Sequence, residues 1–161
     1  MLKVIKNYLS FIKFSHTVFA LPFAAIGFTS GIVIGKGIFT YDLAIKVLLC
    51  MVFARSAAMG FNRWADRNID AKNPRTKERE IPAGKISSNA ALAFIIINCL
   101  GFIITTKFIN NLCFYLSFVA LAVVLGYSYM KRISPLCHLV LGLGLALAPL
   151  GAWLAVTGVF N

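Results

Sequence analysis

Three polar residues recur at every fourth position near the centre of an otherwise apolar chain. Asn62, Asp66 and Asp70 form the pattern Asn-x3-Asp-x3-Asp. On a helix this spacing stacks side chains along one face, with a drift of about 40° per step. Arg55, seven residues before Asn62, falls within about 20° of the same face. The spacing therefore predicts one stripe that carries a cation, an amide and two carboxylates.

The chemistry of this stripe favours a metal and a diphosphate. Mg²⁺ suits Asp66 and Asp70, because it takes one or two carboxylates and completes its shell with water and phosphate oxygens. Arg55 would cost about 2.5–3.5 kcal/mol at the centre of a membrane helix, and arginines placed there usually face an interior cavity. A fixed guanidinium beside a metal suits a diphosphate. The alternative is a solvated helix end, at which the aspartates pair with Arg63 or Arg67.

A second pair of candidates lies near the end of a later apolar segment. Tyr127 and Lys131 are one helical turn apart and therefore share a face. Charge placement puts them on the same side of the membrane as Asp66 and Asp70. Topology alone could also explain them, since lysines collect at cytoplasmic helix ends and tyrosines at the interface. Both interpretations stay open at the level of sequence.

The elements that must position these residues are long apolar segments. Of 161 residues, 60% are hydrophobic and only 13% charged, about half the charged fraction of a soluble domain. A transmembrane barrel would show alternating segments of about ten residues, which are absent. We expect an all-α, polytopic transmembrane helical bundle in which Gly142, Gly144 and Gly151 allow close helix packing. Its spans, about five, are predicted at residues 17–35, 41–61, 87–106, 108–130 and 133–161.

The charged residues gather in one polar segment. Eleven of the 21 charged side chains lie within residues 63–85, and we predict that residues 62–89 form a cytoplasmic loop rich in aspartate and basic residues. With the N-terminus cytoplasmic, twelve lysines and arginines face that side and three face the other. This predicts a multi-pass protein of the cytoplasmic (inner) membrane. The net charge of +11 then reflects contact with the lipid bilayer, and no nucleic-acid partner is expected.

The motifs together resemble one family. Asn-Arg-x2-Asp-Arg-x2-Asp at residues 62–70 is followed by Asn-Pro-Arg-Thr at 73–76 and Ile-Pro-Ala-Gly-Lys at 81–85. This combination resembles the UbiA-type intramembrane aromatic prenyltransferases, and most closely their 4-hydroxybenzoate polyprenyltransferase branch. The naphthoate branch usually has aspartate directly after the asparagine, and the haem farnesyltransferases space their aspartates more tightly.

The resemblance implies a bundle of nine helices, of which residues 1–161 would form the N-terminal part of a single prenyltransferase membrane domain. Members of the family carry a second aspartate-rich motif in a later loop, whereas no Asp or Glu follows Glu80 here. We therefore expect a C-terminal half of the same enzyme as a partner, and expect residues 1–161 alone to be inactive.

The resemblance also implies a reaction: Mg²⁺-dependent transfer of a polyprenyl group from a polyprenyl diphosphate to a small aromatic acid such as 4-hydroxybenzoate, in ubiquinone or menaquinone biosynthesis. Asp66 and Asp70 would hold Mg²⁺, and Asn62 would orient ligands in the catalytic site. Residues expected to bind the diphosphate are Arg55, Arg67, Tyr127 and Lys131. The aromatic acceptor and the prenyl length stay open. The alternative function is that of a non-catalytic helical membrane protein, either a transporter half or an assembly partner.

Overall fold

The chain is all-helical in a computed structural model that describes residues 2–133 and 137–160. No strand occurs among these residues, as the sequence predicts. The start and the end of the last predicted span lie partly outside the described residues. The seven helices are α1 (Leu2–Phe11), α2 (Phe14–Val33), α3 (Tyr41–Ala65), α4 (Arg67–Lys72), α5 (Ser88–Lys107), α6 (Asn111–Ile133) and α7 (Cys137–Thr157).

Four helices, α3, α5, α6 and α7, are long and apolar enough to cross a membrane. A shorter apolar stretch, Thr17–Val33, belongs to α2. These five segments coincide with the predicted spans to within a few residues at most boundaries. Large apolar side chains stand exposed on the outside of the bundle, among them Phe19, Ile97 and Leu139. Such a surface is expected where lipid, rather than water, surrounds the helices.

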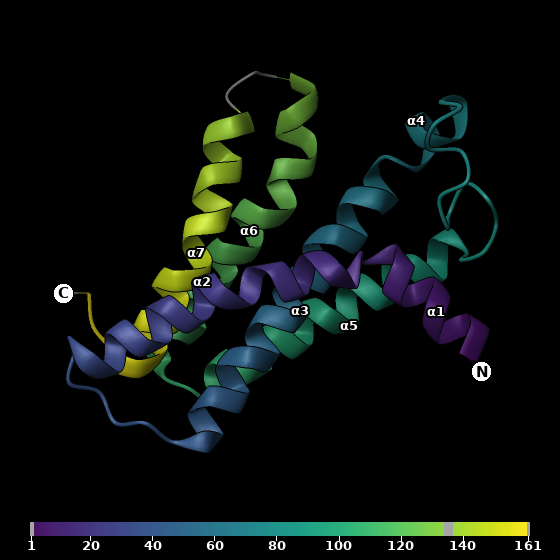
Figure 1. Ribbon diagram of the computed structural model, residues 1–161. Helices are drawn as coiled ribbons and strands as arrows, with labels where there is room; N and C mark the ends of the chain where they lie inside the picture. Colours follow the sequence, from purple (N-terminus) through teal and green to yellow (C-terminus); the bar gives the residue numbers. More distant parts are fainter. Residues whose placement is uncertain (1, 134–136, 161) are drawn as a thin grey trace.

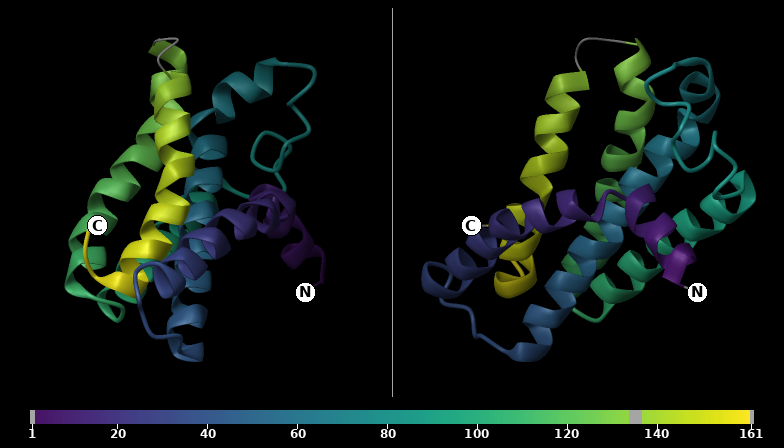
Figure 2. Two further views of the ribbon diagram at one scale, coloured as in Figure 1. Left: turned by 60° about the vertical axis from the view of Figure 1, so that its left-hand side comes forward. Right: turned by 45° about the vertical axis from the view of Figure 1, so that its right-hand side comes forward.

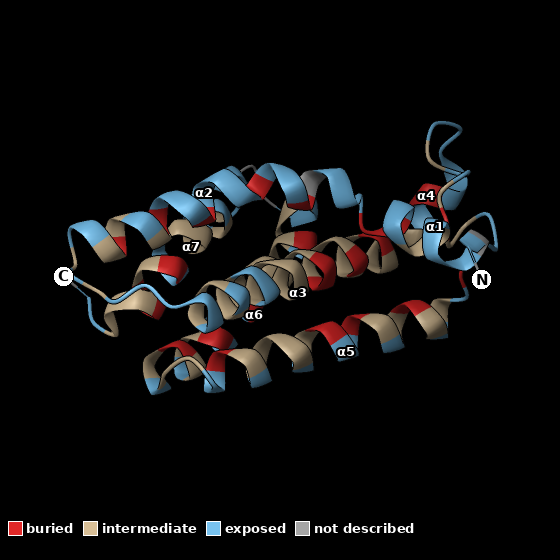
Figure 3. Cartoon of the chain, turned by 60° about the horizontal axis from the view of Figure 1, so that its bottom comes forward, coloured by how far each residue is buried: buried red, intermediate tan, exposed pale blue. Residues whose placement is uncertain are grey.

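Helix α3 lies at the centre of the bundle and packs against α2, α5, α6 and α7. Figures 1 and 2 show α6 and α7 side by side as an antiparallel pair, with α2 crossing α7. Figure 3 shows exposed residues along much of α2, whereas buried residues mark the faces that α3 and α5 turn toward their neighbours. The polar end of α3 is therefore held by the packing of the whole bundle.

Two helices begin at side-chain caps that fix where the loops end. The Thr40 hydroxyl accepts a hydrogen bond from the Leu43 amide at the start of α3, and Ser87 does the same for the Ala90 amide of α5, each at 3.2 Å. Such caps satisfy backbone amides that have no partner within the helix, and each contributes about 1 kcal/mol. Ser87 thus marks the point at which the polar segment becomes a membrane helix.

Helices α2 and α7 pack closely at the glycines where they cross. A Cβ added to Gly27 would overlap the backbone of Pro149, and one added to Gly31 would press against the Val156 side chain at 2.9 Å. Glycine thus allows the two backbones to meet. The prediction for α7 itself was wrong, because a Cβ at Gly142 or Gly151 would meet open space.

The segment 62–89 is helical at both ends rather than a loop throughout. Helix α3 continues to Ala65, α4 follows directly, and α5 begins at Ser88. Apart from Asp66, which separates α3 from α4, the irregular part is residues 73–87, which form a series of turns stabilised by local backbone hydrogen bonds. A small apolar core of Phe11, Ile12, Ile86 and Ala91 packs the end of this segment against α1 and α5.

Candidate diphosphate and metal site

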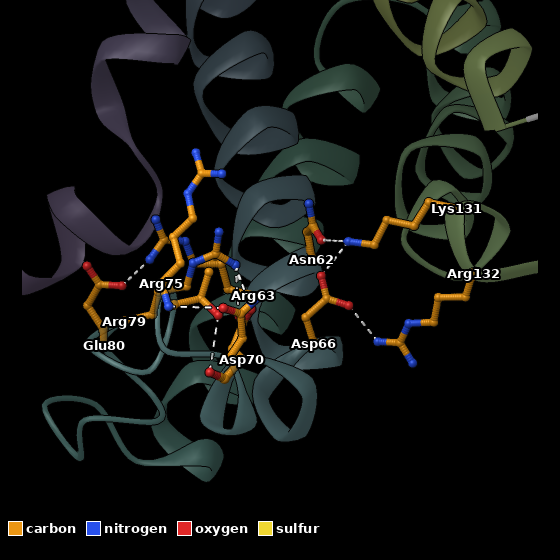
Figure 4. Close-up of polar contacts among 11 residues, drawn as sticks. Asn62, Arg63, Asp66, Asp70, Arg75, Arg79, Glu80, Lys131 and Arg132 are labelled. Atoms are coloured by element: carbon orange, nitrogen blue, oxygen red, sulfur yellow. Dashed lines mark hydrogen bonds and ion pairs between the residues drawn. The ribbon is translucent and has the colours of Figure 1, made fainter. Parts of the chain in front are cut away.

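The polar end of α3 meets the end of α6 at one positive charge. The Lys131 ammonium donates hydrogen bonds to both the Asn62 side-chain oxygen and the Asp66 carboxylate. Arg132 binds the other oxygen of the same carboxylate at 2.7 Å. Figure 4 shows these four side chains converging from the two helices. Asn62 and Asp66 can share one cation because they are one helical turn apart on α3.

The Asp66 carboxylate is largely withdrawn from solvent. Its side chain is 13% exposed, and that of Lys131 is 24% exposed. A carboxylate in such a place needs a counter-charge, since removing an unpaired ion from water costs several kcal/mol. Lys131 and Arg132 supply that charge here. The end of α3 is therefore a place that holds a cation between oxygen ligands.

Asp70 lies in a second cluster, on the other side of the helix end. Its carboxylate accepts two hydrogen bonds from one guanidinium nitrogen of Arg79, at 2.9 and 2.8 Å. Regular helix stops at Ala65, and Asp66 joins α3 to the short α4 that carries Asp70. In Figure 4 the carboxylates of Asp66 and Asp70 point toward different partners. The predicted single face for Asn62 and both aspartates is therefore wrong, because the helix is interrupted between them.

A buried ion pair fixes the polar segment to α1 and α3. Glu80, only 6% exposed, pairs with the Arg63 guanidinium and accepts a 2.5 Å hydrogen bond from the Ser10 hydroxyl. Sequence reasoning missed Glu80, Ser10 and Arg79. A signal existed, because only five acidic residues face 16 basic ones, so each carboxylate could be expected to find a cation.

The other predicted diphosphate ligands lie apart from this cluster or at its edge. Arg55 is half-buried on α3, two turns before Asn62, and its Nε is buried without a hydrogen-bond partner among the described residues. Tyr127 is half-buried on α6, one turn before Lys131. Arg67 instead stacks over the Trp64 ring, 4.4 Å from its centroid, and donates to the Trp64 carbonyl at 2.8 Å.

The oxygens at the end of α3 suit Mg²⁺ in their chemistry. Asn62 and Asp66 already direct an amide and a carboxylate oxygen at one positive charge, that of Lys131. Mg²⁺ takes such oxygen ligands and fills its remaining positions with water and phosphate oxygens. Among the described residues no group of three or more His, Cys, Asp or Glu could hold a metal alone.

The fold and site together define a class, that of helical membrane proteins with an aspartate-rich polar end. Comparison with known families narrows this class. The model of a family described as "UbiA prenyltransferase family" matches residues 20–161. The chain belongs to the UbiA prenyltransferase family, as the motifs between residues 62 and 85 predict.

Individual relatives carry two different names. The chain is 33% identical over 142 residues to the 4-hydroxybenzoate octaprenyltransferase of Vibrio parahaemolyticus serotype O3:K6 (strain RIMD 2210633), covering 88% of this chain and 46% of that protein. It is 36% identical over 126 residues to the protoheme IX farnesyltransferase of Vibrio vulnificus (strain YJ016), covering 74% of this chain and 41% of that protein. The chain thus spans less than half the length of these relatives.

Solved structures share the fold. An apo structure of a UbiA homologue from Aeropyrum pernix K1 superposes with a TM-score of 0.82 at 34% identity, covering 89% of this chain and 51% of that one. A UbiA homologue from Archaeoglobus fulgidus, solved with GPP and Mg²⁺ bound, superposes with a TM-score of 0.74 at 23% identity, covering 96% and 55%. The seven helices therefore correspond to about half of a UbiA-type bundle.

Proposed function

We propose that this chain forms the first half of the active site of a prenyltransferase that moves a polyprenyl group from its diphosphate to an aromatic acid. Membership of the family supports this proposal. The observation that carries it is the convergence of Asn62 and Asp66 on the Lys131 ammonium. Oxygen ligands and a mobile cation at one point are what a metal-bound diphosphate requires.

The basic and hydroxyl side chains near the site have different roles toward the diphosphate. Lys131 exchanges its carboxylate partner for diphosphate oxygens. Arg132, near the end of α6, keeps Asp66 in place. Arg55, with its buried Nε unpaired, offers hydrogen-bond donors deeper in the bundle, two turns from Asn62. Tyr127 adds a hydroxyl one turn before Lys131. Positive groups fixed along the leaving diphosphate favour its departure, because they cost no reorganisation when the charge develops.

Mg²⁺ would be held by Asp66 and Asn62, with Asp70 as a further carboxylate once Arg79 releases it. When bound, the metal would supply Lewis-acid stabilisation of the departing diphosphate. In the structure Lys131 and Arg132 neutralise the Asp66 carboxylate, and Arg79 neutralises that of Asp70. The apolar spans exclude water from the reacting allylic group.

The proposal also covers the orientation of the site in the membrane and the part of the enzyme that this chain forms. We place the N-terminus and the polar segment on the cytoplasmic side of the inner membrane, because lysine and arginine are concentrated there. Residues 1–161 then form the N-terminal part of one membrane domain, and a C-terminal half would supply the second group of aspartates. Arg67 contributes indirectly by bracing the Trp64 ring beside the site.

The acceptor is proposed to be a 4-hydroxybenzoate-like aromatic acid, in ubiquinone or menaquinone biosynthesis. Relatives named for this acceptor and relatives named for protoheme are both similar to the chain. The four-residue spacing of Asp66 and Asp70 favours the aromatic acid, since the haem branch is expected to space its aspartates more tightly.

A second candidate is a helical membrane protein without catalysis, a transporter half or an assembly partner. The observation in its favour is that Asp66 and Asp70 both form ion pairs within the chain. In that case the carboxylates serve only to hold helices together, and Asp66→Asn would leave the function intact.

Product analysis tests the proposal. Native membranes that contain the protein are incubated with labelled geranyl diphosphate, Mg²⁺ and either 4-hydroxybenzoate or haem, and products are identified by mass. We expect geranylated 4-hydroxybenzoate, abolished by EDTA and nearly lost in Asp66→Asn. A geranylated haem product would reassign the acceptor, and unchanged product formation in Asp66→Asn would favour the second candidate.

A further inference from the structure

A basic pocket lies where α1, α2 and the end of α3 meet, apart from the Lys131 site. It has a volume of about 540 Å³ and opens to the surface. Three cationic side chains line it, those of Lys6, Lys13 and Arg63. Ser15 adds a hydroxyl group, whereas Ser10, which also lines the pocket, donates its hydroxyl hydrogen to Glu80. Among the described residues no acidic side chain lines the pocket, so its chemistry is that of an anion site.

An unusual backbone turn brings the pocket together. Lys13 adopts a left-handed conformation, with φ 45° and ψ 64°, between α1 and α2. This conformation is unfavourable for a residue with a Cβ, and such strain persists only where the surroundings impose it. Phe11 and Ile12, both buried, pack the end of α1 and hold the turn. The chain changes direction here (Figure 1), and Lys13 lines the same pocket as Lys6.

The positive charges of the pocket are only partly compensated. Arg63 is paired with the buried Glu80. Neither Lys6 nor Lys13, both exposed, forms an ion pair with any carboxylate of the described residues. Two free ammonium groups above a buried guanidinium suit a group with several anionic oxygens, such as a phosphate ester.

Two apolar side chains also line the pocket, one from the amphipathic helix α1 and one from the start of α2. Leu9 and Phe14 line the pocket and are exposed. Further along α1, Leu2, Val4 and Ile5 are exposed as well. A short helix with exposed apolar and basic residues, attached to a membrane bundle, suits the boundary between headgroups and acyl chains. A ligand of this pocket should therefore carry both an anionic head and a hydrocarbon tail.

We propose that this pocket binds the phosphate headgroup of an anionic phospholipid, with the acyl chains against Leu9 and Phe14. The lipid would anchor α1 to the bundle and would also stabilise the packing of the polar segment. Ser10 links the pocket to the polar segment, because Ser10 lines the pocket and its hydroxyl donates to Glu80. Arg63 likewise faces the pocket while it holds Glu80.

Lipid titration followed by native mass spectrometry in neutral detergent tests this site. Phosphatidylglycerol should bind the full chain at least tenfold more tightly than phosphatidylcholine. Each lysine near an anionic headgroup contributes about fivefold, so the double variant K6Q/K13Q should bind phosphatidylglycerol about 30-fold more weakly. The matched control K72Q/K77Q removes two exposed lysines of the polar segment and should stay within about threefold of wild type.

Each result supports or overturns the proposal. Equal phosphatidylglycerol binding by wild type and K6Q/K13Q, or an equal loss in K72Q/K77Q, would show diffuse surface attraction and no site. Displacement of the lipid by an equal concentration of inorganic phosphate would show a free-phosphate site and overturn the lipid assignment. Should the double variant fail to fold by circular dichroism, the single variants K6Q and K13Q must each weaken binding about fivefold.

Discussion

Lys131 and Asp66 form an ion pair that joins the ends of α6 and α3, although the two residues are 65 positions apart in the sequence. The same ammonium binds Asn62. The Lys131 ammonium thus joins the ends of two membrane helices. It is also the point toward which the oxygen ligands are directed. The cation holds the ends of α3 and α6 together, because Asn62 and Asp66 both direct oxygens at it.

Replacement of Lys131 by Gln should weaken the junction of α3 and α6. Asp66 keeps Arg132 as a partner, so we expect a loss of about 1–2 kcal/mol in the free energy of unfolding, measured by denaturant titration in micelles. Geranyl diphosphate binding should weaken as well. Lys46→Gln serves as the control, because Lys46 pairs with the exposed Asp42 within one helix, where a pair contributes a few tenths of a kcal/mol.

Replacement of Glu80 by Gln should destabilise the protein far more than the same change at Glu78. Glu80 is buried and forms an ion pair with Arg63, whereas Glu78 is exposed. Loss of a buried partner leaves the guanidinium uncompensated and costs about 3 kcal/mol. Thermal unfolding of both variants in the same detergent checks this. Equal melting temperatures for E80Q and E78Q would contradict the assigned role.

Asp70 and Arg79 should behave as a coupled pair. The Asp70 side chain is 8% exposed and that of Arg79 is 34% exposed. We expect a double-mutant cycle with D70N and R79Q to give a coupling energy of about 1 kcal/mol, since contacting residues are not additive. Hydrogen exchange in residues 73–87 should rise in either variant to a similar degree. Additive effects within about 0.5 kcal/mol would show that the pair is not energetically linked.

Replacement of Gly27 by Ala should separate α2 from α7. The new methyl group would overlap the Pro149 backbone, and such overpacking costs about 1–3 kcal/mol. Gly151→Ala is the matched control on the opposite helix, because its Cβ would meet open space and alanine is the better helix former. We expect G27A to unfold at a lower temperature than wild type and G151A to unfold at the same or a higher one.

Much of the fold could be predicted because the composition of a segment shows whether it can span a membrane. A bilayer-crossing helix needs about 20 apolar residues, and that requirement marks its segment without reference to any partner. Close packing could not be located in this way. The glycines of α7 are as small as Gly27, but it is Gly27 that lies against the Pro149 backbone, and such a crossing depends on tertiary structure.

Sequence spacing predicted one part of the local geometry at the end of α3 and missed another. Spacing of four residues puts Asn62 and Asp66 on one face, and they do share a cation. The same spacing fails for Asp70, because the regular helix is interrupted at Asp66 and Arg79 attracts the later carboxylate. Long-range partners such as Glu80 for Arg63 leave no periodic signal, and only the scarcity of acidic residues hints at them.

The most direct test of the central claim is ligand-induced thermal stabilisation of the purified chain by geranyl diphosphate with Mg²⁺. At about 100 times its dissociation constant, a ligand stabilises the folded state by about 2.7 kcal/mol. We predict this stabilisation for wild type and for the control Asp42→Asn, an exposed carboxylate at the far end of α3, and its loss in Asp66→Asn or with EDTA. Equal stabilisation of Asp66→Asn and wild type, or none in wild type, would contradict the account.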